Sequence, residues 1–111
     1  MTIALLRLSD IPDGGAVVRE GPGGAGVLSV LVTRRGAQVR AFRNACPHAR
    51  HPLERFDGTV LMADGFVLCA AHAASFDPMS GRCVGGPAAG RALHPLPLRL
   101  EGEWVWLENP G

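Results

Sequence analysis

The sequence predicts a small all-β domain built from antiparallel strands, and three observations carry this expectation. Short apolar runs rich in β-branched residues alternate with turn-forming segments near both ends of the chain. Glycine and proline number 15 and 9 among 111 residues, roughly twice their ordinary share. No segment repeats its apolar residues with the period of a helix, so long helices are not expected.

The first part of the chain contains four candidate strands. Pro and Gly turn signals at 9–15 separate the first two runs, and EGPGGAG at 20–26 predicts a flexible turn. The segment 34–37 has the position of a hairpin turn between the next two runs. The predicted strands are 3–8, 16–19, 27–33 and 38–42.

The last part of the chain predicts a strand at 93–100 and another at 104–107, joined by a hairpin at 101–103. Pro95 and Pro97 place the first of these at a sheet edge or make it irregular, because proline has no N–H for the sheet ladder. Trp104 and Trp106 are two residues apart and share one face of their strand. Core packing is the expectation for both.

The middle of the chain has few strands, many turns and three of the four histidines. Its candidate strands are 59–63, 66–69 and 75–77, with a hairpin turn at Asp64 and Gly65. We expect one domain, in which residues 1–43 and 90–111 form an antiparallel sandwich or barrel base. The loop-rich residues of about 44–89 form a subdomain inserted into it.

Composition and charge exclude several classes of protein. The hydrophobic fraction of 47% and charged fraction of 19% are typical of a folded chain and not of a disordered one. The eleven basic residues are scattered and the net charge is +1, so no nucleic-acid footprint is predicted. No apolar run approaches the roughly 20 residues of a membrane span, and the start MTIALLRLSD lacks the features of a signal peptide. We expect a cytoplasmic protein without a membrane partner.

Two cysteine and histidine pairs carry the candidate chemistry. Cys46 and His48 form a Cys-x-His motif, and Cys69 and His72 form a Cys-x-x-His motif after it. Thiolate and imidazole are ligands of both zinc and iron-sulfur centres. The four side chains predict either one tetrahedral zinc ion or a two-iron cluster that takes one Cys and one His from each loop.

The segments CPHARHPLE and FVLCAAHAASFDPMSGRCVGGPA resemble the Rieske family, and specifically its small soluble ferredoxins. The resemblance implies the Rieske iron-sulfur fold and a [2Fe-2S] cluster in which two histidines replace two cysteines on one iron. Carried over to this chain, it implies that Cys46 and Cys69 hold the inner iron. It implies in the same way that His48 and His72 hold the outer iron.

The sequence departs from the respiratory members of that family at four positions. His51 and Ala71 stand where those members have two disulfide-bonded cysteines. Ala74 and Phe76 stand where they have a Ser and a Tyr whose hydroxyls bond the cluster sulfurs. The resemblance therefore implies a potential that is low within the Rieske range of about −150 to +300 mV.

Three neighbouring features receive smaller roles. Cys83 is expected to pack as a small buried hydrophobe, since four ligands are already assigned. Gly85-Gly86-Pro87 resembles the family's proline-containing loop that covers the cluster. His51 is expected to be a solvated loop residue.

The resemblance to ring-hydroxylating dioxygenase ferredoxins implies a one-electron carrier that transforms no substrate. Its partners would be a flavin reductase and a terminal oxygenase, docking on 46–52 and 70–75, with Arg50 the nearest charge to His48. One alternative is the small subunit of a nitrite reductase, which often lacks the ligands. Another is a structural zinc module. An oxygenase catalytic subunit would need a second domain with a 2-His-1-carboxylate iron site, which these 111 residues do not contain.

Overall fold

The computed structural model describes residues 2–23, 26–47, 51–70, 74–86 and 90–108. The described residues form three antiparallel sheets and one short 3-10 turn, η1 (Leu8–Asp10), which confirms the all-β prediction. Within this described part, no helix is long and apolar enough to cross a membrane.

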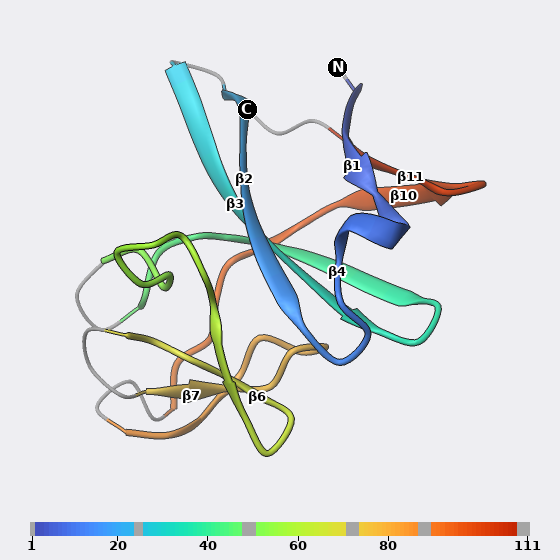
Figure 1. The fold of residues 1–111 in the computed structure, drawn as a ribbon. Coiled ribbons are helices and arrows are strands. Elements are labelled where there is room, and N and C mark those ends of the chain that lie inside the picture. Colours follow the sequence, from blue (N-terminus) through green and yellow to red (C-terminus); the bar gives the residue numbers. More distant parts are fainter. Residues whose placement is uncertain (1, 24–25, 48–50, 71–73, 87–89, 109–111) are drawn as a thin grey trace.

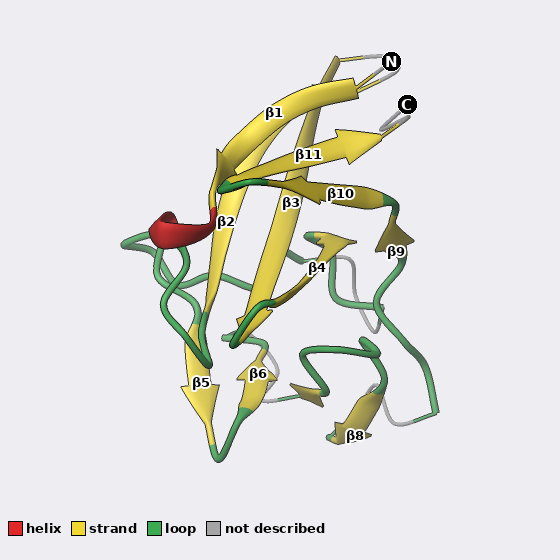
Figure 2. Cartoon of the chain, turned by 90° about the vertical axis from the view of Figure 1, so that its right-hand side faces the viewer, coloured by secondary structure: helices red, strands yellow, loops and turns green. Residues whose placement is uncertain are grey.

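The three sheets, named A, B and C below, occupy successive levels of the molecule. Sheet A lies at one end and sheet C at the other (Figures 1 and 2). Sheet A has the order β1 (Thr2–Arg7), β11 (Trp104–Glu108) and β10 (Leu98–Glu101). Sheet B has the order β2 (Ala16–Gly23), β3 (Gly26–Arg35), β4 (Gln38–Arg43) and β9 (Pro95–Leu96). Sheet C has the order β5 (Leu61–Ala63), β6 (Phe66–Leu68), β7 (Ser75–Phe76) and β8 (Cys83–Gly85).

Sheet B has a hydrophobic core on each face, which explains the nearly continuous apolar run in β3. Successive side chains of a strand point to opposite faces. Val30 and Val32 therefore belong to one core, together with Val105 and other residues of sheet A. Leu31 belongs to the other core, which contains Cys46, Cys69 and residues of sheet C. We call these the base core and the cluster core.

The two prolines divide the strand predicted at 93–100, as their chemistry requires. Leu96 pairs with Ala41 of sheet B, whereas Leu98 pairs with Leu107 of sheet A. Pro97 lies between β9 and β10, where the chain passes from one sheet to the other, and its carbonyl accepts a hydrogen bond from Glu108 N at 3.0 Å. The predicted irregularity is confirmed.

Two expectations about the elements are wrong, and one strand was not predicted. The flexible turn predicted at 20–26 is mostly strand, because β2 and β3 stay paired as far as Gly23 and Gly26. Trp104 and Trp106 lie on the outer face of β11, where Arg7 and Arg99 stack on their rings, while Val105 and Leu107 face the core. The short strand β8 was not predicted, since a Cys-Val-Gly segment carries too little pattern.

The hairpin turn at Asp64 and Gly65 is confirmed, with both residues at positive φ between β5 and β6. Sheet C falls within residues 44–89, and sheets A and B fall outside that range. The division of the single domain into a base and a cluster-binding subdomain remains a prediction.

Candidate metal centre

The first candidate ligand loop follows β4 and is closed by the backbone of its own cysteine. Cys46 N donates to the carbonyl of His51 at 2.8 Å. Beneath it, the buried side chain of Asn44 makes three hydrogen bonds. Its Oδ1 accepts from Leu53 N at 2.9 Å, and its Nδ2 donates to Ser29 Oγ at 3.0 Å and Glu54 Oε1 at 2.7 Å. Asn44 therefore joins both ends of this loop to sheet B.

The second candidate ligand loop connects β6 with β7 and repeats the same closure. Cys69 N donates to the carbonyl of Ala74 at 2.8 Å, the same separation along the chain as from Cys46 to His51. A further bond, from Ala70 N to the Leu53 carbonyl at 3.3 Å, connects the second loop to the end of the first. The two loops are held side by side by their backbones.

The cysteines of the two loops are fully buried in the cluster core. Cys46 and Cys69 are 0% and 1% exposed and share this core with Leu53, Val67 and Phe76. No disulfide joins any of the three cysteines, all of which the structure describes. Soft thiolate sulfurs in a dry, apolar surrounding match the inner side of an iron-sulfur centre, so the donor set present fits the cluster.

The two candidate histidine ligands, His48 and His72, lie outside the described residues. Within the described part, no three His, Cys, Asp or Glu side chains are gathered as a metal site. In the sequence, each of these histidines falls between the cysteine and the carbonyl that close its loop. The assignment of all four ligands remains a prediction.

The remaining residues singled out in the sequence lie at the end of one of the two loops or on or next to the strands that follow the second loop. Cys83 is buried in the cluster core, as the packing role predicts, and its Sγ donates to the Gly85 carbonyl at 3.1 Å. Ala74 and Phe76 are fully buried. Gly86 has a φ of 90°, whereas Pro87 of the same predicted loop lies outside the described residues. His51 is exposed, as expected of a solvated loop residue.

A third segment, 77–94, contacts sheet B and the first loop through two hydrogen bonds that the sequence did not reveal. The buried hydroxyl of Thr33 on β3 donates to the Pro78 carbonyl. The guanidinium of Arg91 donates from Nη1 to the Pro47 carbonyl at 2.9 Å, inside the first ligand motif. Neither residue belongs to a recognisable motif, and their partners are far away in the sequence, so no local signal could have identified them.

A polar turn begins this segment. The carboxylate of Asp77 accepts hydrogen bonds from the backbone of Ser80 at 2.9 Å and Met79 at 2.8 Å. These bonds lower the pKa of the Asp77 carboxyl below its ordinary value of 3.8. The turn is therefore most stable with Asp77 ionised.

Comparison with known proteins supports the same interpretation of the site. The model of the Rieske [2Fe-2S] domain matches residues 2–100 of the chain. No curated protein sequence matches the chain. The four similar solved structures described next share 17–24% sequence identity with this chain, so they show the fold alone.

Among them is the Sphingomonas yanoikuyae B1 ferredoxin, with 24% identity, a TM-score of 0.74, and coverage of 99% of this chain and 100% of that one. A carbazole 1,9a-dioxygenase complex of reduced oxygenase and oxidized ferredoxin matches with 18% identity and a TM-score of 0.74, covering 97% and 93% of the two chains.

Two further structures differ in length or role. The terminal oxygenase of carbazole 1,9a-dioxygenase from Novosphingobium sp. KA1 matches with 20% identity and a TM-score of 0.75, over 96% of this chain but only 29% of the oxygenase. A protein assigned as an NADPH nitrite reductase small subunit matches with 17% identity and a TM-score of 0.65, over 96% and 97%.

The family match decides between the two cofactors that the motifs left open, because the matched domain holds a [2Fe-2S] cluster and not a zinc ion. With the domain model covering residues 2–100 and two buried cysteines on paired loops, this chain belongs to the Rieske [2Fe-2S] family.

Proposed function

We propose that the protein is a one-electron carrier in a multicomponent oxygenase system and is not itself a catalyst. In this role it receives electrons from a flavin reductase and passes them to a terminal oxygenase. The single observation that carries the proposal is the pair of closed, joined loops that bury Cys46 and Cys69 in one core. The bound cluster supplies one-electron chemistry, taking up and releasing a single electron.

The chain's own residues give the centre a rigid and dry inner side. The Cys46 and Cys69 N–H groups are used in closing the loops, so each cysteine has a fixed backbone. Cys46 and Cys69 hold the inner iron in this proposal, and His48 and His72 hold the outer one. A fixed ligand set limits the reorganisation that accompanies each electron transfer, which suits a carrier.

A groove of about 580 Å³, lined by Ala70 of the second loop and by residues that follow the first loop, supports a docking site there. Its lining includes the exposed Pro52 and Ala70 and the fully exposed ring of Phe56. An exposed aromatic side chain beside a groove is typical of an interaction surface. We place the contact with redox partners on this side, over 46–52 and 70–75, with the predicted contribution of Arg50 outside the described residues.

Iron and acid-labile sulfide analysis of anaerobically purified protein tests the cofactor. We expect two iron atoms and two sulfides per chain, with visible absorption that bleaches on reduction. One zinc ion and no sulfide would contradict the proposal.

Cysteine variants test the ligand assignment. Cys46→Ser and Cys69→Ser should lose the cluster, whereas Cys83→Ala, a control at a third buried cysteine of the same core, should keep it. Loss of the cluster in Cys83→Ala together with retention in Cys46→Ser or Cys69→Ser would show that the ligands are wrongly assigned.

The nitrite reductase small subunit remains a second candidate, favoured by one structural match of nearly full length. The presence of all four candidate ligands in the sequence argues for the carrier, because many such subunits lack them. Electron transfer from the reduced protein to a purified terminal oxygenase, without nitrite-reducing activity in the mixture, would favour the carrier.

A further inference from the structure

A second groove, of about 430 Å³, lies on the other side of the first ligand loop. It is lined by Cys46 and Pro47 of the loop and by Ala45, Ala92, Arg43 and His94. Arg43 and His94 are exposed, as is Arg91, whose guanidinium holds the Pro47 carbonyl. We call Arg43, Arg91 and His94 the basic rim.

Backbone hydrogen bonds join the rim residues to one another and to β8, and one side-chain bond joins the rim to the candidate ligand loop. Arg43 N donates to the His94 carbonyl at 2.9 Å, and Cys83 N donates to the Arg91 carbonyl at 2.9 Å. The Arg91 side chain bonds Pro47, which stands between Cys46 and His48 in the sequence. The backbones of Arg43 and Arg91 are therefore fixed by the scaffold, and the Arg91 guanidinium is held beside the first ligand motif by its bond to Pro47.

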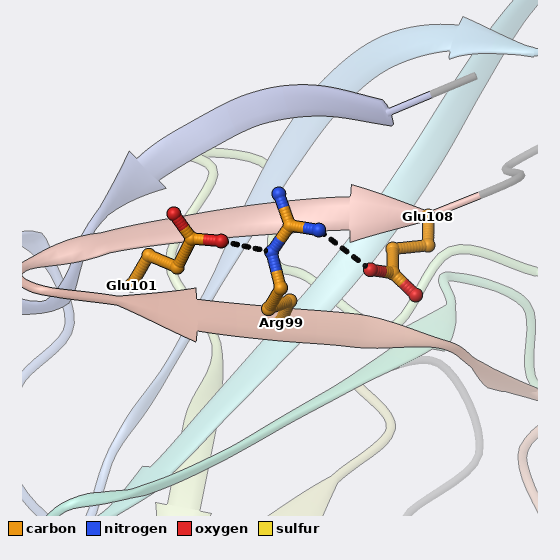
Figure 3. A network of polar contacts seen from close by, with 3 residues as sticks. All are labelled: Arg99, Glu101 and Glu108. Carbon is orange, nitrogen blue, oxygen red and sulfur yellow. Dashed lines mark hydrogen bonds and ion pairs between the residues drawn. The ribbon is translucent and has the colours of Figure 1, made fainter.

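Neither guanidinium of the rim forms an ion pair with a described residue. Both ion pairs found among the described residues belong to Arg99 on sheet A, which contacts Glu101 at 2.6 Å and Glu108 at 3.1 Å (Figure 3). The positive charge of Arg99 is thus neutralised by two neighbouring carboxylates. Arg43 and Arg91 have no such carboxylate among the described residues and are available to one from outside.

We propose that the basic rim is an electrostatic docking surface for an acidic face of a redox partner protein. The inference rests on the proposed electron-carrier function and adds Arg43 and Arg91 to the surface expected around the two loops. Guanidinium groups bind carboxylates through paired, charge-assisted hydrogen bonds. A pair of cations beside the first ligand loop attracts and orients an acidic partner where electrons must leave.

Small redox probes of opposite charge measure this local field without a known partner. The holoprotein is reduced with dithionite, and one electron then passes to either ferricyanide or hexaammineruthenium(III), with no proton transferred. A change in the protein's reduction potential alters both rates in the same direction. The ratio of the two rates is therefore largely independent of that potential. At low ionic strength, Arg43→Gln or Arg91→Gln should lower the ferricyanide-to-ruthenium ratio on the order of tenfold, for a trivalent probe approaching to about 10 Å.

Arg35→Gln is the matched control, because Arg35 is exposed and lies at the opposite end of the β3 and β4 pair from Arg43. It changes the net charge equally and should leave the ratio within about twofold, since the field of a distant exposed charge is screened. Equal ratios for all three variants would overturn the proposal. An Arg91→Lys variant should restore most of the ratio, because it keeps the positive charge.

A direct binding measurement separates an acidic polypeptide from a small anion. A fluorescein-labelled ten-residue polyglutamate should bind the oxidised holoprotein in low salt, and Arg43→Gln with Arg91→Gln should weaken that binding at least tenfold. Competition by inorganic phosphate at constant ionic strength would assign the rim to a small anion and overturn the protein-docking proposal. A purified protein without iron and sulfide would instead contradict the proposed function itself, and the docking surface with it.

Discussion

At the residue scale, one hydroxyl connects the sheet shared by both cores to the segment that supports the candidate centre. Thr33 is fully buried on β3, and its Oγ1 donates to the Pro78 carbonyl. Thr33→Val keeps the volume but leaves that carbonyl without its donor, which should lower the free energy of unfolding by about 1–3 kcal/mol. Urea denaturation measures the change.

The matched control is Thr59→Val. Thr59 is exposed and its hydroxyl bonds Asp57 at 2.6 Å, so its loss should cost about 0.5 kcal/mol or less. Equal effects of the two substitutions would show that the Thr33 bond does not stabilise the fold.

Asp77 gives a second prediction at this scale, in the dependence of stability on pH. Because the pKa of its carboxyl is lowered in the folded state, its ionised form stabilises the fold at pH values above the ordinary value of 3.8. That contribution is lost as the pH falls through the folded pKa. Asp77→Asn should therefore be less stable than the wild type at pH 7, by less than about 1 kcal/mol because solvent screens the partly exposed group.

The difference between wild type and Asp77→Asn should shrink as the pH falls below 3.8 and through the lowered folded pKa. Urea denaturation at pH 7 and at pH 3 measures it. A difference that grows on acidification would contradict the assigned sign.

The buried residues Ala74 and Phe76 set a third prediction, which rests on the proposed cofactor. The family resemblance places them where hydroxyls bond the cluster sulfurs, and both side chains are fully buried here. Hydrogen bonds to sulfur stabilise the added electron. Ala74→Ser combined with Phe76→Tyr should therefore raise the potential in voltammetry. An unchanged potential with an intact cluster would show that missing hydroxyls do not set it.

At the scale of elements, the turn after Asp77 packs directly on sheet B. Gly81 has a φ of +77°, and a Cβ there would lie 2.6 Å from Phe42 Cε1. Gly14 has nearly the same φ, +75°, but nothing lies within 4 Å of its Cβ position. Substituting alanine at Gly14 therefore measures the backbone strain alone, whereas substituting it at Gly81 adds steric overlap with Phe42.

Gly81→Ala should destabilise the fold by about 1–3 kcal/mol more than Gly14→Ala, since overpacking against Phe42 adds to the strain that both share. Thermal unfolding of the two variants checks the difference. Equal losses would mean that Phe42 moves aside without cost.

The strands themselves could be predicted because β-branched runs and turn residues are local signals. Strands β1, β3, β4 and β11 appear within a few residues of their expected bounds. The predicted hairpins gave the pairings of β3 with β4 and of β10 with β11. Pairings between strands far apart in the sequence could not be predicted in this way, such as β1 with β11 and β4 with β9. The outward face of Trp104 was mispredicted because aromatic size indicates burial, whereas a stacked arginine covers the ring instead.

The same distinction applies to the candidate site. The motif spacing identified Cys46 and Cys69, since both lie in short, chemically unusual segments. It did not identify Asn44, which closes the first loop from the end of β4, or Arg91, which reaches Pro47 from a distant segment. Side chains that position a site from afar leave no pattern in the sequence.

At the scale of the whole molecule, the small net charge makes local charges important. The chain carries +1; two thiolates subtract two charges and a diferric Fe₂S₂ unit adds two, so the proposed holoprotein is +1 when oxidised and 0 when reduced. Long-range attraction from the net charge is therefore weak in both states. Any electrostatic preference for a partner must come from a local surface such as the basic rim.

Sheet B contributes side chains to both cores. This shared sheet predicts that the two cores unfold together. Hydrogen bonds from Thr33 Oγ1 to the Pro78 carbonyl and from Arg43 N to the His94 carbonyl join sheet B to the segment that contributes Cys83 and Leu93 to the cluster core. Trp104 and Trp106 lie on sheet A, whereas Cys46 and Cys69 belong to the cluster core on the other side of sheet B. Tryptophan fluorescence and cluster absorption therefore report on opposite ends of the molecule.

We expect the two signals to change together in anaerobic urea denaturation, with coincident midpoints, because small domains with shared cores unfold cooperatively. Thr33→Val should shift both midpoints downward by the same amount, since it removes a hydrogen bond of the sheet that both cores share. If absorption is lost at a lower urea concentration than the fluorescence changes, residues 44–89 unfold separately, and the shared sheet does not couple the two cores. The exposed Thr59→Val variant should leave both midpoints in place.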